Sequence, residues 1–261
     1  MSAQATQSIF DLLADAIRAG SRAAVATVIK GEPGGAKLLV LADDVIGTFG
    51  NSVFDQQVSQ EARRLLNLER SETQSMAGPK GEVEVFFESF PPPPTLIIFG
   101  AVHVAQALTT YAKQLGYRVV VVDVRAKLAT AERFPDADEI VLEWPDVALE
   151  NRTVESNTAI AILSHDPKFD EPALLGSLAT PARYIGAVGS RKTNADRRVR
   201  LQEAGVDEAS IQRVRGPIGL DIGASTPEEM AISILAEIIA SERGRKGGPL
   251  TTASGKIRAR V

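Results

Sequence analysis

One stretch of this 261-residue sequence decides the fold, and it reads Thr95-Leu96-Ile97-Ile98-Phe99-Gly100-Ala101-Val102-His103-Val104-Ala105. Its first half, Leu96 to Phe99, is continuously apolar, which is typical of a strand buried on both faces of a parallel sheet. Gly100 then marks a tight turn, and a helix is predicted from Val102 to Leu115. A buried strand that turns directly into a helix is the opening unit of a Rossmann-like domain.

The sequence downstream of this unit continues to alternate between strands and helices. Strands are predicted at 118–123, 139–142, 158–163 and 184–188, and helices at 171–178 and 194–204. A last helix is predicted after Thr226, because Thr226, Pro227 and Glu229 fit a capping box. This alternation predicts an α/β fold with a doubly wound parallel sheet over residues 95–243, in the common strand order 3-2-1-4-5.

The sequence upstream has a different pattern and predicts a small α+β domain over residues 1–90. Its expected helices are 9–19 and 56–68, and its expected strands are 22–30, 37–41, 45–49 and 82–87. The prolines at 91–94 cannot continue a helix or a central strand and form a stiff linker. Residues 244–261, which are basic and rich in small residues, are expected to be a flexible tail.

The composition limits the classes of function. The chain has no cysteine, which excludes disulfides, thiolate zinc sites and a cysteine nucleophile within it. A net charge of −4 gives no indication of a nucleic-acid partner. No apolar stretch reaches the roughly 18 residues that a membrane span requires, and no signal peptide is recognised. A cytoplasmic protein with neither a nucleic-acid nor a membrane partner is therefore expected.

The Gly100 turn is the first candidate binding element. In a dinucleotide fingerprint the first glycine makes the turn and a middle glycine lets the backbone approach a pyrophosphate. Here Val102 stands at the middle position, where its side chain hinders that approach. Asp123 closes the second predicted strand, where an acid that binds a ribose would lie. The pattern predicts the Rossmann fold more strongly than ordinary dinucleotide binding.

The only two histidines form the second candidate. His103 follows the first predicted strand and His165 the fourth, and in the expected order these strands are neighbours at the point where ligands bind. Asp166 adds a carboxylate beside His165. These side chains either orient a ligand and exchange protons with it, or cap loops and helices and shape the crevice. A metal site from these three residues is a further alternative, although none is predicted.

Two later turns complete the candidate site. Gly189, Ser190, Arg191 and Lys192 run from a strand toward a helix and combine close backbone approach, a hydroxyl and positive charge, which suits a phosphate. The alternative is a solvated helix start with incidental basic residues. Asp221 lies in a glycine-containing loop, 217–224, and either faces the ligand or only turns the chain.

Taken together, these segments resemble the xanthine dehydrogenase accessory factor family, XdhC/CoxI. The similar blocks extend over most of the chain, and their order and number carry the resemblance: 35–40, 47–53, 96–105, 132–135, 164–166, 184–186, 189–192, 217–224 and 226–231. Two positions depart from the family pattern. Val102 replaces a common glycine, and Ser52 replaces a common cysteine, so the side chain at position 52 cannot serve as a soft sulfur ligand or carry a persulfide.

The resemblance implies an accessory protein that binds molybdenum cofactor (molybdopterin) or its nucleotide form and assists its maturation and insertion into a molybdenum hydroxylase. The implied partners are the apo-enzyme of the xanthine or carbon monoxide dehydrogenase type and a cysteine desulfurase, and a homodimer is expected. No catalytic constellation is visible, so a chaperone is favoured over an enzyme. The alternatives are an NAD(P)-dependent oxidoreductase and a non-catalytic scaffold with a vestigial nucleotide pocket.

Overall fold

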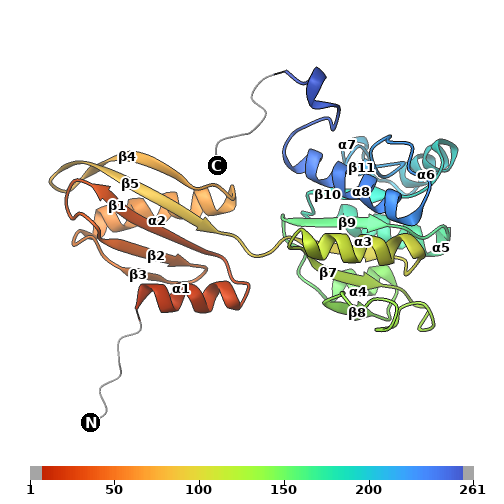
Figure 1. Ribbon diagram of the computed structural model, residues 1–261, viewed down its shortest axis with the longest axis horizontal. Coiled ribbons are helices and arrows are strands. Elements are labelled where there is room, and N and C mark those ends of the chain that lie inside the picture. The colour runs from red at the N-terminus through yellow and green to blue at the C-terminus, as the bar shows by residue number, and fades with distance from the viewer. Residues whose placement is uncertain (1–7, 255–261) are drawn as a thin grey trace, which may run out of the picture. The chain divides into compact units, whose positions relative to one another are not determined.

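The computed structural model describes residues 8–254 and divides the chain into two compact units, which separate between Pro92 and Pro93. The N-terminal unit contains an antiparallel five-stranded sheet in the order β3-β2-β1-β5-β4 (Figure 1). The strands are β1 (Ala23–Lys30), β2 (Lys37–Leu41), β3 (Val45–Gly47), β4 (Glu72–Gly78) and β5 (Gly81–Phe90).

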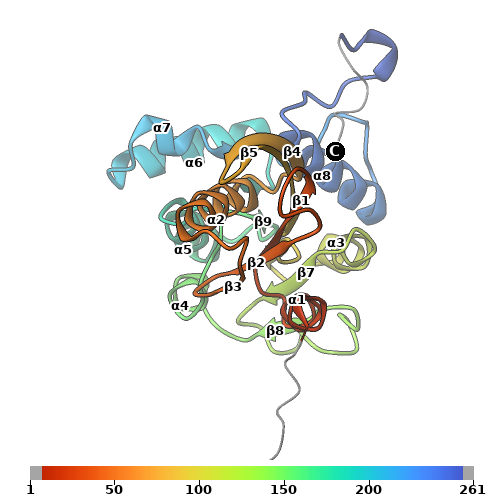
Figure 2. The same cartoon turned by 90° about the vertical axis from the view of Figure 1, so that its left-hand side faces the viewer.

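Two helices cover opposite faces of this sheet, as Figure 2 shows. Alternating residues of the strands produce this arrangement, because successive side chains point to opposite faces. Ala24, Ala26 and Val28 pack with α2 (Ser52–Asn67), whereas Ala23 and Val25 pack with α1 (Ile9–Arg18). The prediction of a small α+β domain is therefore confirmed.

Two details of this unit were not predicted correctly. The helix expected at 56–68 begins at Ser52, because Asn51 is its N-cap and accepts a hydrogen bond from the Phe54 amide. Strand β4 was missed because its sequence is polar and lies at the edge of the sheet, where no apolar alternation is needed. The hairpin signal Gly78-Pro79-Lys80-Gly81 between β4 and β5 was available in the sequence.

The second unit contains a six-stranded parallel sheet in the order β11-β10-β9-β6-β7-β8. Counted from β6 as the first strand, this is the predicted order 3-2-1-4-5 with one short strand added at the edge. The strands are β6 (Thr95–Phe99), β7 (Arg118–Val122), β8 (Glu139–Val141), β9 (Thr158–Ile162), β10 (Tyr184–Ala187) and β11 (Val214–Arg215). The predicted doubly wound Rossmann-like fold is thus confirmed.

Helices cover both faces of the parallel sheet (Figure 1). Leu96 and Ile98 of β6 pack with α3 and α8 on one face, while Ile97 and Phe99 pack with α4, α5 and α6 on the other. The helices are α3 (His103–Gln114), α4 (Pro145–Glu150), α5 (Pro167–Leu178), α6 (Arg191–Glu203), α7 (Glu208–Ile211) and α8 (Pro227–Glu242).

Helices α5 and α6 begin earlier than the sequence pattern predicted. Their N-caps are Asp166 and Ser190, which accept hydrogen bonds from the amides of Lys168 and Thr193. The capping box of α8 is as predicted, with Thr226 and Glu229 bonded reciprocally. Within the segment expected as a tail, Leu250–Thr252 forms a 3₁₀ helix, and residues 255–261 lie outside the described residues.

Candidate functional site

The β6–α3 turn, Gly100 to Val102, packs directly against the end of β9. Gly100 has a φ of +105°, and a Cβ atom built on it would lie 2.9 Å from the Ser164 nitrogen. Only glycine fits here, because both the left-handed backbone and the neighbouring backbone exclude a side chain. Gly100 therefore allows the turn to pack closely on the end of the neighbouring strand β9. This packing role does not depend on a contact between Gly100 and a ligand.

The three backbone amides of this turn are already hydrogen-bonded. Gly100 N–H donates to the carbonyl of Val122 at 2.9 Å, and Val102 N–H donates to the carbonyl of Gly100 at 2.9 Å. The Ala101 amide donates to the carboxylate of Asp123 at 2.7 Å. A pyrophosphate needs free amides at such a turn. In this conformation the turn offers it none from residues 100–102.

Asp123 lies at the end of β7, as predicted, and its carboxylate is buried and fully engaged. Besides the Ala101 amide, it accepts hydrogen bonds from the Arg125 amide and guanidinium, the shortest at 2.6 Å. Burial acts to raise the pKa of Asp123, but these hydrogen bonds outweigh it and hold the pKa below its usual range. Binding of a ribose by Asp123 remains a prediction, and it would require Arg125 to move.

Val102 has a structural reason for replacing glycine. It is the N-cap of α3, makes no side-chain cap, and its half-buried side chain packs on the apolar core beneath α3 and α8. The valine thus belongs to the helix–sheet packing on that face.

The two histidines both follow strands of the parallel sheet at its carboxyl-terminal edge and are exposed. His103 begins α3, whereas His165 precedes α5, and these two helices cover opposite faces of the sheet. His103 lines a hollow of about 520 Å³ that we call the α3 hollow, together with Gln106, Thr110, Glu132, Asp136 and Glu228. His165 precedes α5 and favours the ionised form of Asp170 electrostatically. A role for both imidazoles toward one ligand remains a prediction.

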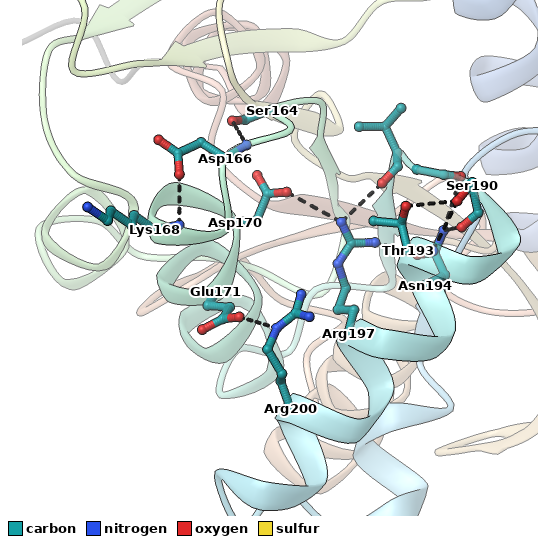
Figure 3. A network of polar contacts seen from close by, with 12 residues as sticks. Ser164, Asp166, Lys168, Asp170, Glu171, Ser190, Thr193, Asn194, Arg197 and Arg200 are labelled. Carbon is teal, nitrogen blue, oxygen red and sulfur yellow. Dashed lines mark hydrogen bonds and ion pairs between the residues drawn. The ribbon is translucent and has the colours of Figure 1, made fainter.

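A buried ion pair, which the sequence did not indicate, connects α5 to α6. The Arg197 guanidinium lies 3.3 Å from the Asp170 carboxylate, and the two side chains are only 4% and 7% exposed. Arg197 also donates to the carbonyl of Val188, at the end of β10, and to the side chain of Asn194 (Figure 3). Because Asn194 donates in turn to the carbonyl of Gly189, this network fixes the β10–α6 turn.

The environment of this pair shifts both ionisation equilibria. Burial raises the pKa of Asp170 to about 6, and Arg197 offsets only part of that effect. Burial likewise lowers the pKa of the Arg197 guanidinium, and Asp170 opposes the shift. A buried pair with perturbed pKa values at a ligand-binding edge is a frequent mark of a functional site.

The β10–α6 turn, Val188 to Ser190, has its Val188 and Gly189 carbonyls bound to Arg197 and Asn194, and only Ser190 of the three residues is exposed. Gly189 has a φ of +140°, and Ser190 caps α6 (Figure 3). Arg191 and Lys192 occupy the first turn of α6 and are exposed. Neither side chain makes a hydrogen bond or ion pair with the residues in the described range 8–254. The turn and the first turn of α6 thus carry Gly189, Ser190, Arg191 and Lys192, and their binding of a phosphate remains a prediction.

The loop at 217–224 is held in a defined conformation. Its Gly219 amide donates to Glu237 at 2.8 Å, and Glu237 also accepts a hydrogen bond from the hydroxyl of Tyr184 at 2.6 Å. Ser233 donates to the carbonyl of Leu220. Asp221 is exposed on this loop. Its role toward a ligand remains a prediction.

Sequence reasoning missed four residues of these networks: Arg125, Asp170, Asn194 and Arg197. The Asp170–Arg197 pair joins residues that only the fold brings together. One signal was present: Asn194 and Arg197 lie three and six residues after Arg191, on one face of α6. Over residues 8–254 no cluster of His, Asp and Glu could hold a metal ion. None of the helices in that range has the length and apolar character needed to cross a membrane.

The fold and the polar edge of its sheet define a protein with a Rossmann-type binding domain. Comparison with known families makes this specific: residues 96–238 match the XdhC Rossmann domain, and residues 16–76 match the XdhC and CoxI family. The chain belongs to this family.

Individual relatives agree with that assignment. The chain is 29% identical to YqeB of Escherichia coli K12 over 82% of its length, and 31% identical to a probable xanthine dehydrogenase subunit of Bacillus subtilis over 61%. It is 27% identical to the molybdenum cofactor insertion chaperone PaoD of Escherichia coli K12 over 59%. The chain spans 41%, 46% and 42% of these relatives, less than half of each.

A solved structure shares the fold. It is a crystal structure described as a xanthine dehydrogenase from Bacillus halodurans, which matches with a TM-score of 0.55 and 21% identity. The match covers 93% of this chain and 97% of the other.

Proposed function

We propose that this protein binds molybdenum cofactor, or its nucleotide form, and assists its maturation and insertion into a molybdenum hydroxylase of the xanthine or carbon monoxide dehydrogenase type. The observation that carries the proposal is the polar carboxyl-terminal edge of a Rossmann sheet in a chain of the XdhC family. Its protein partner is the apo-enzyme, and its location is the cytoplasm, as expected from the sequence.

The residues at this edge fit one end of the cofactor. Ser190, Arg191 and Lys192 supply a hydroxyl and positive charge that suit the phosphate of the cofactor. The chain has no cysteine, so it supplies no thiolate at the molybdenum end. When bound, the cofactor would supply the redox chemistry, whereas this chain's residues hold and orient its phosphate.

The nicotinamide-dependent alternative gains no support from the geometry. The amides of Gly100, Ala101 and Val102 are engaged, and Asp123 is paired with Arg125. A saturable fluorescence titration with NADH would revive this alternative.

The test is to denature freshly purified protein and identify the released compound by mass spectrometry. The proposal expects a phosphorylated pterin, with retention reduced by alanine at Arg191 or Lys192 and, if the other candidate residues also contact the cofactor, at His103. Release of no small ligand, together with firm binding to a molybdenum hydroxylase subunit, would instead indicate a scaffold with a vestigial pocket.

A further inference from the structure

A second hollow, which we call the arginine hollow, runs along α6 from Arg191 to Leu201 and faces the segment 211–217. It has a volume of about 250 Å³, and its polar lining consists of Arg191, Asn194, Arg197 and Arg198. Gly216 and Pro217, which follow β11, form part of its wall. None of the described residues that line it is acidic, so every charged group on its wall is positive.

The α3 hollow of the same domain has the opposite character. Its lining includes the carboxylates of Glu132, Asp136 and Glu228. Its one arginine, Arg133, donates to the carbonyls of Ala101 and Leu128, so that guanidinium is already bound to the protein. These two hollows therefore differ in charge: carboxylates line the α3 hollow, whereas arginines line the arginine hollow.

Two arginines of the arginine hollow have unused donor capacity. Arg197 is 4% exposed, and its Nε has no hydrogen-bond partner among the residues that the structure describes. A buried donor without a partner is unfavourable and is expected to be compensated by a ligand or by water. Arg191 is exposed and makes no contact with a carboxylate of the described chain. Arg198, by contrast, is paired with Glu208.

The backbone amides at the start of α6 also favour an anion beside the arginine hollow. The amides of Arg191 and Lys192 occupy the first two positions of α6 and so have no partner earlier in the helix. Close packing fixes the opposite wall, because a Cβ atom on Gly216 would lie 2.2 Å from the Asn194 side-chain oxygen. The hollow therefore has arginines on its α6 wall and a closely packed wall opposite, and it lies beside the first turn of that helix.

We propose that the arginine hollow is a phosphate subsite, which holds a phosphate monoester or pyrophosphate group through Arg191 and the first turn of α6, with Arg197 behind them. For its biological ligand the inference rests on the proposed function, since the phosphate would be that of molybdenum cofactor or its nucleotide form. The subsite itself is defined by this chain alone and takes inorganic pyrophosphate as a probe.

The test is calorimetric titration of the full chain with pyrophosphate at constant ionic strength. Arg191→Ala removes an exposed side chain without a structural contact, so the fold is retained and the affinity is expected to fall about tenfold, as for the loss of one charge-assisted hydrogen bond. Arg191→Glu is expected to abolish binding. The matched control is Arg215→Ala, which removes an exposed arginine that lines a neighbouring hollow.

The subsite would be overturned if Arg191→Ala and Arg215→Ala lowered the affinity for pyrophosphate equally, or if the parent protein did not bind pyrophosphate. The two proposals fail separately. Pyrophosphate binding that depends on Arg191, without a pterin in the purified protein, keeps the subsite and rejects the cofactor role. A pterin retained equally by the parent and Arg191→Glu keeps cofactor binding by the chain but rejects Arg191 as the contact to its phosphate, and with it the subsite.

Discussion

The β6–α3 turn and the β10–α6 turn each follow a central strand of the same sheet and contain a glycine with positive φ, yet they use it differently. Gly100 brings the first turn against the backbone of Ser164, and the amides there are consumed by the protein. Gly189 leads into a capped helix whose first turn carries unpaired positive charge. A glycine at a strand–helix turn therefore does not by itself mark the phosphate site.

The largest expected effect concerns the ion pair that fixes the β10–α6 turn. Replacing Arg197 with methionine removes the guanidinium and leaves Asp170 buried without its partner. We expect a loss of about 3–5 kcal/mol in the free energy of unfolding, measured by chemical denaturation. Arg191→Met on the same helix is the control and should change stability by less than about 0.5 kcal/mol. Similar stabilities for both variants would show that the pair does not hold the turn.

The two glycines should also differ in their tolerance of a side chain. Gly100→Ala combines left-handed strain with a backbone clash and should cost about 3 kcal/mol. Gly189→Ala should cost less, about 1–2 kcal/mol, because its Cβ would meet side chains and no backbone, with Thr193 at 3.1 Å and Asn194 at 3.4 Å. Thermal unfolding of the two variants measures the difference, and a reversed order would contradict the packing described for the Gly100 turn.

Asp170 should make stability depend on pH. Folded Asp170 keeps its proton up to a pKa of about 6, whereas the unfolded carboxyl releases it near the ordinary value of about 3.9. The contribution of Asp170 to the free energy of unfolding, about 2–3 kcal/mol, is therefore fully present below about pH 4 and is lost as the pH rises through 6. The difference in stability between the parent and Asp170→Asn, followed from pH 4 to 7, should show this slope. If the stabilities of the parent and of Asp170→Asn changed with pH in parallel, the raised pKa of Asp170 would be ruled out.

The smallest expected effect tests why the β6–α3 turn does not fit a nucleotide. Val102→Gly restores the spacing of a dinucleotide fingerprint but leaves the Ala101 amide bonded to Asp123. We expect a loss of about 1 kcal/mol in stability from the removed packing and no gain in NADH binding by fluorescence titration. Tight binding of NADH by this variant would show that the valine alone blocks the turn.

The sequence predicted the parallel sheet, its strand order and the two turns, because buried strands and caps leave strong local patterns. Edge elements such as β4 and β11 were missed, since a polar or two-residue strand has no such pattern. The candidate site was predicted as residue types near the strand ends. What those residues do could not be predicted, because Arg197 pairs with Asp170, 27 residues earlier, and Asn194 reaches back to the carbonyl of Gly189. Arg125 lies only two residues after Asp123, but the sequence does not show that their side chains pair.

The most direct test of where phosphate binds is amide chemical-shift mapping of the ¹⁵N-labelled protein during a pyrophosphate titration. The contrast between the two turns predicts that the largest shifts appear at the amides of Arg191 and Lys192, with those of Ala101 and Val102 unchanged. The largest shifts at Gly100 to His103 would contradict it.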